Sequence, residues 1–247
     1  MNKILASHRS IRKYKPDAID ETLLNKILKA GTYASTTGNM QVYSMVVTRD
    51  HELRRKLWEA HFRQDMVLQA PVHITFCADF HRFSAWCINR KAEPGYDNFL
   101  SFFTGAIDAL LASQNVCLAA EEQGLGICYL GTATYNADKI IEILELPERV
   151  VPVAAIVMGY PDENPGITDR LPLKAVIHQE KYRTFTPEII DSVYHERESS
   201  GQTMELLKIN EKETLAQIYT DKRYTRKDNE FFSEKFLNAI RKQRFFG

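Results

Sequence analysis

The spacing of apolar and polar positions predicts a chain in which helices alternate with strands. Amphipathic spacing predicts helices over residues 20–31, 50–62 and 137–145, and a further helix with Thr186 as N-cap and Pro187 at its first position. Apolar runs predict strands over residues 42–48, 72–78, 125–130 and 150–158. Strands separated by helices favour an α/β or α+β sandwich over an all-β fold.

The longest periodic segment covers residues 98–123 and predicts a central core helix. One helical stripe of this segment contains Phe99, Phe103, Ile107, Leu110, Gln114, Cys117 and Ala120. Apolar runs along the chain are interrupted before the roughly 18 residues that a transmembrane helix needs. We therefore expect no membrane span.

The character of the sequence changes after Gly159, where a stretch rich in proline and turn-forming residues predicts a long loop. Near the C-terminus, Phe231, Phe232, Phe236 and Ile240 have the spacing of one helix face. We expect residues 1–182 to form the main domain and residues 183–247 to form a helical extension of the same structural domain.

Composition and charge narrow the class of protein. The 247 residues carry a formal net charge of zero at pH 7, which argues against a protein whose main role is binding nucleic acid or an anionic membrane. The four cysteines form no paired spacing, and no histidine lies at a zinc-site distance from them. We expect free thiols, no metal, no signal peptide and a cytoplasmic location.

Several common catalytic motifs are absent from the sequence. Gly124 and Gly126 are not a dinucleotide fingerprint, because they end a predicted helix and open a strand, the reverse of a Rossmann turn. There is no phosphate-binding GxxxxGK[ST] loop, no HExxH and no GxSxG. The sequence therefore identifies no side-chain nucleophile with its base.

The segment His8-Arg9-Ser10-Ile11-Arg12-Lys13-Tyr14 is a candidate anion site. Two arginines three positions apart around a serine offer charge-assisted hydrogen bonds to a phosphate. On charge alone, a solvated basic terminus is the better explanation of the segment.

Three further segments change that balance. A polar loop, Ser35-Thr36-Thr37-Gly38-Asn39-Met40-Gln41, precedes a strand; Tyr129-Leu130-Gly131-Thr132 ends another; and Arg170-Leu171-Pro172 follows the proline-rich loop. In this order and spacing, over residues 4 to about 182, the chain resembles the FMN-dependent nitroreductase family. It looks most like the oxygen-insensitive, NADPH-preferring nitroreductases and flavin reductases with a C-terminal extension.

The resemblance implies an α+β, nitroreductase-type three-layer sandwich with a mixed central sheet flanked by helices, dimerised through the long helix. It implies FMN as cofactor and NADPH or NADH as reductant. The acceptors would be nitroaromatics, quinones or related small molecules, reduced by ping-pong hydride transfer through the flavin. A homodimer, with no nucleic-acid or membrane partner, is expected.

The resemblance also implies a set of FMN-binding residues. His8, Arg9, Ser10 and Arg170 would hold the phosphate and ribityl end. Arg12 would support the N1/O2 edge of the ring, the only side-chain contribution to catalysis beyond the flavin. Gln64 would bond the pyrimidine edge, and Tyr129, Leu130 and Gly131 would line the ring. From the partner subunit would come Ser35, Thr36, Thr37 and Asn39.

Two features leave the reading open. Thr168 stands where the subgroup usually has lysine, which removes one phosphate charge. Arg223 and Arg226 are candidates for the NADPH 2′-phosphate, although a solvated loop also explains them. The rival functions are another flavoenzyme of the superfamily, of reductive dehalogenase or flavin-fragmenting type, and a non-enzymatic anion-binding protein.

Overall fold

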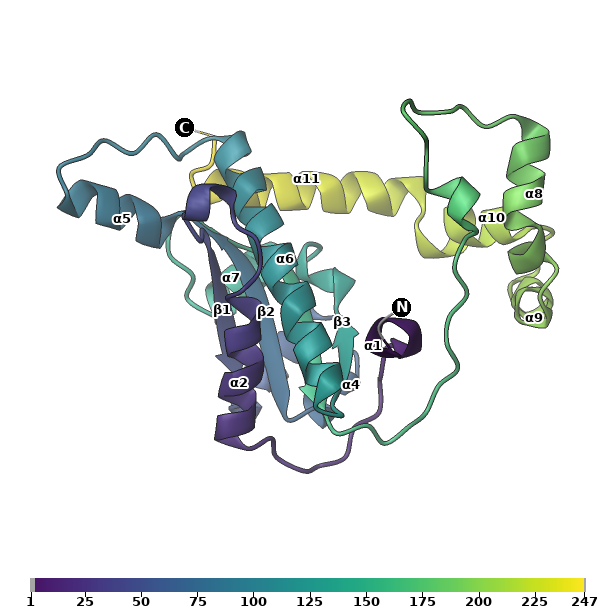
Figure 1. The fold of residues 1–247 in the computed structure, drawn as a ribbon, viewed down its shortest axis with the longest axis horizontal. Helices are drawn as coiled ribbons and strands as arrows, with labels where there is room; N and C mark the ends of the chain where they lie inside the picture. Colours follow the sequence, from purple (N-terminus) through teal and green to yellow (C-terminus); the bar gives the residue numbers. More distant parts are fainter. Residues whose placement is uncertain (1–2, 247) are drawn as a thin grey trace. The chain divides into compact units, whose positions relative to one another are not determined.

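A computed structural model describes residues 3–246 and contains the elements labelled in Figure 1. The strands are β1 (Tyr43–Thr48), β2 (Val72–Asp79), β3 (Gly126–Tyr129) and β4 (Val150–Gly159). The helices are α1 (Lys3–Ser7), α2 (Glu21–Gly31), α3 (His51–Ala60), α4 (Met66–Gln69), α5 (His81–Asn89), α6 (Phe99–Glu122), α7 (Ala137–Ile143), α8 (Pro187–Glu198), α9 (Gly201–Asn210), α10 (Leu215–Ile218) and α11 (Arg226–Lys242). The short turns are η1 (Thr37–Asn39), η2 (Gly131–Ala133), η3 (Leu173–Ala175) and η4 (Tyr219–Arg223).

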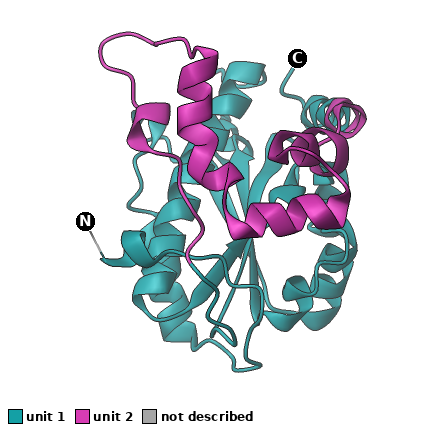
Figure 2. Ribbon diagram, turned by 90° about the vertical axis from the view of Figure 1, so that its right-hand side faces the viewer, with its two compact units in different colours: residues 1–166, 232–247 teal, residues 167–231 magenta. Residues whose placement is uncertain are grey.

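The chain divides into two compact units, coloured separately in Figure 2. Unit 1 contains the described residues up to Gly166 together with those from Phe232 onward, and unit 2 contains Ile167–Phe231. In unit 1 the C-terminal residues Ile240 and Phe245 pack with Phe80 and Phe102. The boundary after residue 182 that the sequence suggests stays a prediction.

Unit 1 is built on a four-stranded sheet in the order β1-β2-β4-β3. All three strand pairs are antiparallel, so the mixed sheet expected from the resemblance is antiparallel throughout its four strands. The parallel pairing is an isolated bridge between Ser10 and Ile127, where the N-terminal segment lies along β3. Every residue of β2 is buried, including the polar residues His73, Thr75 and Asp79.

Helices cover both faces of this sheet and form a three-layer sandwich. Side chains from α2 and α6 fill the core on one face, and those from α3, α4 and α7 fill the core on the other. Local signals set where the helices begin: the Asp20 carboxylate accepts hydrogen bonds from the backbone N–H groups of Thr22 and Leu23, as expected of an N-cap.

The apolar stripe of α6 is only partly the face that turns to the sheet. The buried side is made mostly of small residues, among them Gly105, Ala106, Ala109 and Ala112, and includes Cys117 and Ala120 of the stripe. Phe103 and Ile107 of the stripe are exposed. A Cβ at Gly105 would lie 3.0 Å from the Val42 carbonyl oxygen, so the small side chains allow close packing. The large apolar residues are left on the outer side of the helix.

Among the described residues, α6 is long and apolar enough to cross a membrane by length and composition, although Asp108 interrupts its apolar run. The core helix of a soluble protein passes the same test. Here α6 packs against β2 and α2.

Unit 2 is helical and includes α8, α9, α10 and the start of α11. Helix α8 begins where Thr186 and Pro187 predicted it. Ion pairs within the unit join Arg197 to Asp169 and Lys212 to Asp221.

Candidate functional site

The N-terminal segment is attached to β3 at a point where no side chain fits. The backbone N–H of Ile11 donates to the Ile127 carbonyl at 2.9 Å, beside the bridge formed by Ser10. A Cβ at Gly126 would lie 2.6 Å from Cγ1 of Ile11, well inside van der Waals contact. Glycine at 126 therefore lets the basic segment lie directly on the strand.

Arg12 lies beside this junction, and its guanidinium has no partner among the described residues. Its backbone N–H donates to the Glu163 carboxylate, but its guanidinium makes no hydrogen bond or ion pair with any residue in 3–246. Burial raises the pKa of the Cys128 thiol, while the charge of Arg12 and a hydrogen bond from Ser10 lower it. Arg12 and Ser10 thus lie near the end of β3.

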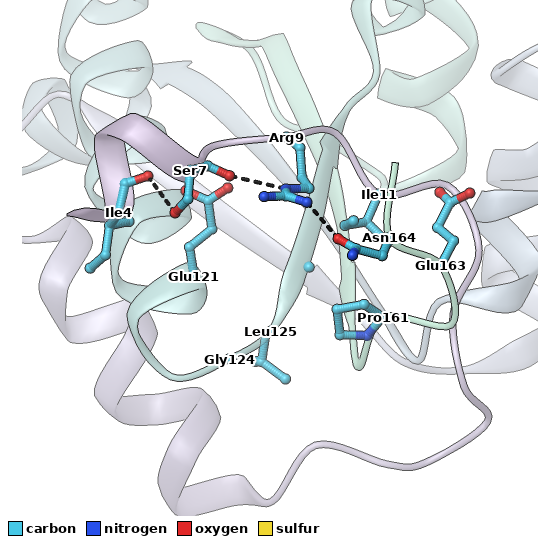
Figure 3. A pocket seen from close by; sticks show the side chains of 11 residues that line it. Ile4, Ser7, Arg9, Ile11, Glu121, Gly124, Leu125, Pro161, Glu163 and Asn164 are labelled. Carbon is cyan, nitrogen blue, oxygen red and sulfur yellow. Dashed lines mark hydrogen bonds between the residues drawn. The ribbon is translucent and has the colours of Figure 1, made fainter. Parts of the chain in front are cut away.

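Arg9 is engaged by its own chain. Its guanidinium donates to the Ser7 carbonyl at 3.1 Å, to the side-chain oxygen of Asn164, and to the Pro165 carbonyl at 3.1 Å. It lines a pocket of about 330 Å³ together with Glu121 and Glu163 (Figure 3). This pocket carries two carboxylates and one guanidinium, a poor balance for an anion.

His8 is held by an acidic residue of α6. Its Nδ1 lies 2.7 Å from Oε1 of Glu121, which is near the C-terminal end of the helix. The pair fixes the ring just before the segment reaches β3. His8, Ser10 and Arg12 therefore all remain candidates for FMN binding, as predictions.

The carbonyl oxygen of Gln64 accepts no hydrogen bond from any residue in 3–246. Its Nε2 donates to the His61 carbonyl at 3.0 Å and to Oγ1 of Thr132 at 3.3 Å. A backbone carbonyl only accepts, so the nitrogen must be the atom on this side of the amide. Oε1 of Gln64 is left as an acceptor beside η2.

The segment around the end of β3 has backbone N–H groups without an acceptor in the turn and side chains that pack into the core. Tyr129 Oη lies 2.8 Å from Ser113 Oγ, and Ser113 in turn donates to the Leu110 carbonyl, so the phenol is the donor. Leu130 is buried and its N–H donates to Ala155 at 2.8 Å. A Cβ at Gly131 would meet nothing within 4 Å. Because Gly131 and Thr132 open η2, the turn supplies no acceptor for their N–H groups.

The polar loop over residues 35–39 is attached to α6 through one carboxylate. Buried Asp108 accepts hydrogen bonds from the Thr36 hydroxyl, from the Thr37 N–H at 3.0 Å and from the Val42 N–H at 3.3 Å. Asn39 has a positive φ of 55°, which asparagine tolerates better than most residues. Ser35, Thr37 and Asn39 are exposed.

Three predicted arginines lie in unit 2. The Arg170 guanidinium donates to the Thr168 hydroxyl at 2.9 Å and to the Thr168 and Asp169 carbonyls at 3.0 Å. Arg223 lies over the Tyr219 ring at 5.9 Å, and Arg226 pairs with Glu230 at 2.7 Å. Their roles toward the two phosphates stay predictions.

Sequence reasoning missed four residues that organise this region: His61, His73, Asp108 and Thr132. Asp108 carried a signal, since it is an acidic residue in the middle of an otherwise apolar helix. His73 carried a weaker one, a titratable residue inside an apolar strand. Thr132 stood in the strand-end motif without being singled out.

Comparison with known proteins decides the family. The nitroreductase family model matches residues 5–160. The chain belongs to the nitroreductase family. This confirms the family that the sequence resembled and the α+β fold expected with it. It also confirms the assignment as an FMN-dependent oxidoreductase that uses NAD(P)H.

Relatives of this nitroreductase-family chain match over most of its length. It is 35% identical over 185 residues to the FMN reductase [NAD(P)H] of Bacillus subtilis, covering 73% of each chain. A crystal structure from Bacteroides fragilis matches with a TM-score of 0.98 and 49% identity, over 99% of this chain and 100% of that one. The NADPH:FMN oxidoreductase of Vibrio harveyi complexed with NAD⁺ matches with a TM-score of 0.80 and 30% identity, over 96% of both chains.

Proposed function

We propose that this member of the nitroreductase family binds FMN at the end of β3 and reduces small conjugated acceptors, nitroaromatics or quinones, with NADPH or NADH. One observation carries the proposal: two segments that are far apart in the sequence meet β3 and the turn that follows it. Ser10 pairs with Ile127 of β3, the charge of Arg12 lowers the pKa of the Cys128 thiol, and Gln64 bonds Thr132 of η2.

The residues at this point fit the chemistry of a flavin. Gln64 offers a carbonyl acceptor suited to the N3–H of the pyrimidine edge, and η2 offers two backbone N–H donors. The unpaired guanidinium of Arg12 offers a positive charge for the N1/O2 edge, where it would favour the reduced state. Ser10 and His8 precede Arg12 along the same segment and are the closest candidates for the ribityl and phosphate end.

When bound, FMN supplies the chemistry itself, accepting a hydride from the nicotinamide and passing it to the acceptor in a second half-reaction. The chain's own contribution is to hold and orient. Tyr129 does not serve as a proton donor, because burial raises the pKa of its phenol and its hydroxyl is bonded to Ser113. The ring of Tyr129 and the side chain of Leu130 instead form apolar packing behind the turn.

The rival functions differ in testable ways. Relatives carry the names FMN reductase [NAD(P)H] in Bacillus subtilis and NADPH-flavin oxidoreductase in Vibrio harveyi, which favours a reductase over a dehalogenase or flavin-fragmenting enzyme. A non-enzymatic anion-binding protein is disfavoured by Gln64, whose free acceptor repels an anion.

We also propose that the enzyme is a homodimer that buries the outer side of α6. Large apolar residues are exposed along that side over about three turns: Phe99, Leu100, Phe103, Ile107, Leu110 and Leu111. A continuous apolar stripe of this kind on a single chain is typical of an obligate interface. The loop over residues 35–39, attached to α6 by Asp108, would then reach the flavin of the other subunit.

A cytoplasmic location is proposed on the state of the cysteines. Cys77, Cys87, Cys117 and Cys128 are free and buried. Reduced thiols are the ordinary state in that compartment.

The experiment begins with the purified protein. A yellow chain that releases FMN on heating, and whose flavin is bleached by NADPH or NADH in anaerobic stopped flow and recoloured by nitrofurazone or a benzoquinone, supports the function. Colourless protein that binds no added FMN excludes it. Bleaching without recolouring by either acceptor points to another flavoenzyme of the superfamily.

The location of the site is tested by two neighbouring variants. Arg12→Ala removes the unpaired guanidinium, and we expect FMN to bind roughly tenfold or more weakly, since a hydrogen bond to a charged group contributes about 1.5–3 kcal/mol. Lys13→Ala removes the same charge one position along the chain and serves as the control. Equal affinities in the two variants would move the flavin away from this segment.

A further inference from the structure

Two histidines form a buried pair directly behind the predicted flavin site. His61, at the end of α3, and His73, on β2, are both fully buried. Their Nε2 atoms lie 3.1 Å apart, and Nδ1 of His61 lies 2.8 Å from Oγ1 of Thr132. Burial lowers the pKa of His61 to about 4 and that of His73 well below its usual range, so both rings are neutral at pH 7.

Because both rings are neutral, each carries one N–H hydrogen, and burial indicates which nitrogen of each ring carries it. Each neutral ring carries one N–H, and the two facing Nε2 atoms share a single hydrogen between them. Nδ1 of His73 is buried without a hydrogen-bond partner among the described residues. A buried N–H without an acceptor is rarer than an unpaired lone pair. The hydrogen of His73 therefore belongs on Nε2.

This choice sets the direction of the whole chain of hydrogen bonds. His73 Nε2–H donates to His61 Nε2, so His61 carries its hydrogen on Nδ1 and donates to Thr132 Oγ1. Gln64 Nε2 donates to the same oxygen. Both lone pairs of the Thr132 hydroxyl are then used as acceptors, and its own hydrogen is left to donate elsewhere.

The hydroxyl hydrogen of Thr132 is free to donate to a bound ligand. Thr132 is half-buried and lies in η2, between Gly131 and the amide of Gln64. We propose that the Thr132 hydroxyl donates a hydrogen bond to bound FMN, with His61 and His73 as positioning residues that keep the hydroxyl turned outward. The inference deepens the proposed function and rests on it.

A metal site does not explain the pair. Within residues 3–246 no group of three histidine, cysteine, aspartate or glutamate side chains could hold a metal ion. The oxygen that meets His61 belongs to a threonine, whose neutral hydroxyl is a weak ligand beside imidazole and carboxylate. A fixed hydrogen-bond chain accounts for both the geometry and the neutral rings.

The bond should favour the reduced cofactor. Two-electron reduction adds negative charge to the ring, and a hydrogen bond to a charged acceptor is stronger than one to a neutral acceptor. Thr132→Val keeps the shape of the side chain and removes the hydroxyl. We expect it to lower the affinity for reduced FMN about tenfold more than that for oxidised FMN, equivalent to a midpoint potential about 30 mV lower.

Matched variants separate this effect from a change of fold. Thr132→Ser restores the hydroxyl and should restore the potential. Thr134→Val removes a hydroxyl from the same turn, one that donates to the Gly131 carbonyl at 3.3 Å, and should leave the potential unchanged. A purely structural role for Thr132 would lower stability without moving the ratio of the two affinities.

The positioning role is tested in the wild-type holoenzyme, which avoids a folding defect. The ¹⁵N chemical shifts of the two histidines report which nitrogen carries hydrogen, and we expect Nε2 for His73 and Nδ1 for His61. The opposite tautomers, or equal affinity ratios in Thr132→Val and wild type, would overturn the inference while leaving the proposed function intact. Wild-type protein that binds no FMN refutes the proposed function instead.

Discussion

Tyr129 donates its phenolic hydrogen to Ser113 on α6, across an oxygen–oxygen distance of 2.8 Å. Tyr129, the last residue of β3, thus has its polar end turned into the core. Burial raises the pKa of this phenol, so it stays protonated at any working pH.

Tyr129→Phe should therefore be a stability variant. Losing one hydrogen bond costs about 0.5–1.5 kcal/mol of unfolding free energy. Urea unfolding measures this loss, and Ser113→Ala should give a larger one, because it also removes the bond to the Leu110 carbonyl and leaves the phenol without its acceptor. FMN affinity and turnover should stay within about twofold of wild type. A large loss of activity at unchanged stability would show that the phenol faces the reaction.

Asp108→Asn should loosen the loop over residues 36–42. The carboxylate accepts three hydrogen bonds there, and an amide at the same place turns one acceptor oxygen into a donor that faces an N–H or a hydroxyl. The expected cost is about 1–3 kcal/mol. Hydrogen exchange at the Thr37 and Val42 amides reports the loosening. Asp97→Asn, just before α6, serves as the control and should leave both amides protected.

The dimer prediction is tested on the outer side of α6. Phe103→Glu places a charge in the middle of the exposed apolar stripe and should convert the dimer to monomer in sedimentation. FMN should be lost with it, because part of the site would come from the other subunit. Met204→Glu places a charge at an exposed apolar position of α9 and should leave the dimer intact. A wild-type monomer that holds FMN would contradict the proposal.

Arg223 and Arg226 are expected to recognise the 2′-phosphate of NADPH. Both guanidiniums are exposed, and the ion pair between Arg226 and Glu230 is a weak surface pair. Replacing both by alanine should raise the KM for NADPH tenfold or more and leave that for NADH unchanged. The matched control replaces Lys222 and Lys227, which removes the same charge without bidentate geometry. Equal losses with both nicotinamides would mean that this segment does not select between them.

The buried histidine pair predicts acid sensitivity. A folded-state pKa below the unfolded value of about 6.5 means that the unfolded chain binds more protons, so stability falls as pH decreases below about 6.5. For His61, with a folded pKa of about 4, the loss between pH 7 and pH 5 is about 2 kcal/mol. His73→Phe should make unfolding free energy less dependent on pH in this window. An identical dependence in wild type and variant would contradict a neutral buried His73.

Much of the fold could be predicted because its signals are local. The apolar run at residues 72–78 identifies β2, and the Asp20 carboxylate identifies the start of α2. For α6, the sequence predicted the helix but not which side of it packs on the sheet. Periodicity finds an apolar face, yet this helix is apolar on both sides, and close approach to the sheet selects the small residues.

The candidate site was predictable only where short motifs carried it. The bond from Thr36 to Asp108 and the contact between the His61 and His73 rings join residues on separate elements. No spacing rule connects such positions, since only packing of the elements brings them together. The direction of the Arg9 side chain could not be predicted from the sequence either, because its partners Asn164 and Pro165 lie far along the chain.

The close contact of the N-terminal segment with β3 at Gly126 also has a consequence for the order in which the chain folds during synthesis. Residues 8–12 leave the ribosome well before the strand that receives them, which follows more than one hundred residues later. Pairings between residues so far apart in the sequence form late in folding, because the loss of chain entropy on closing the loop must first be offset by local contacts. During synthesis the basic segment must wait, exposed, until β3 emerges. A nascent chain therefore completes the junction between this segment and β3 only after the strand has been translated.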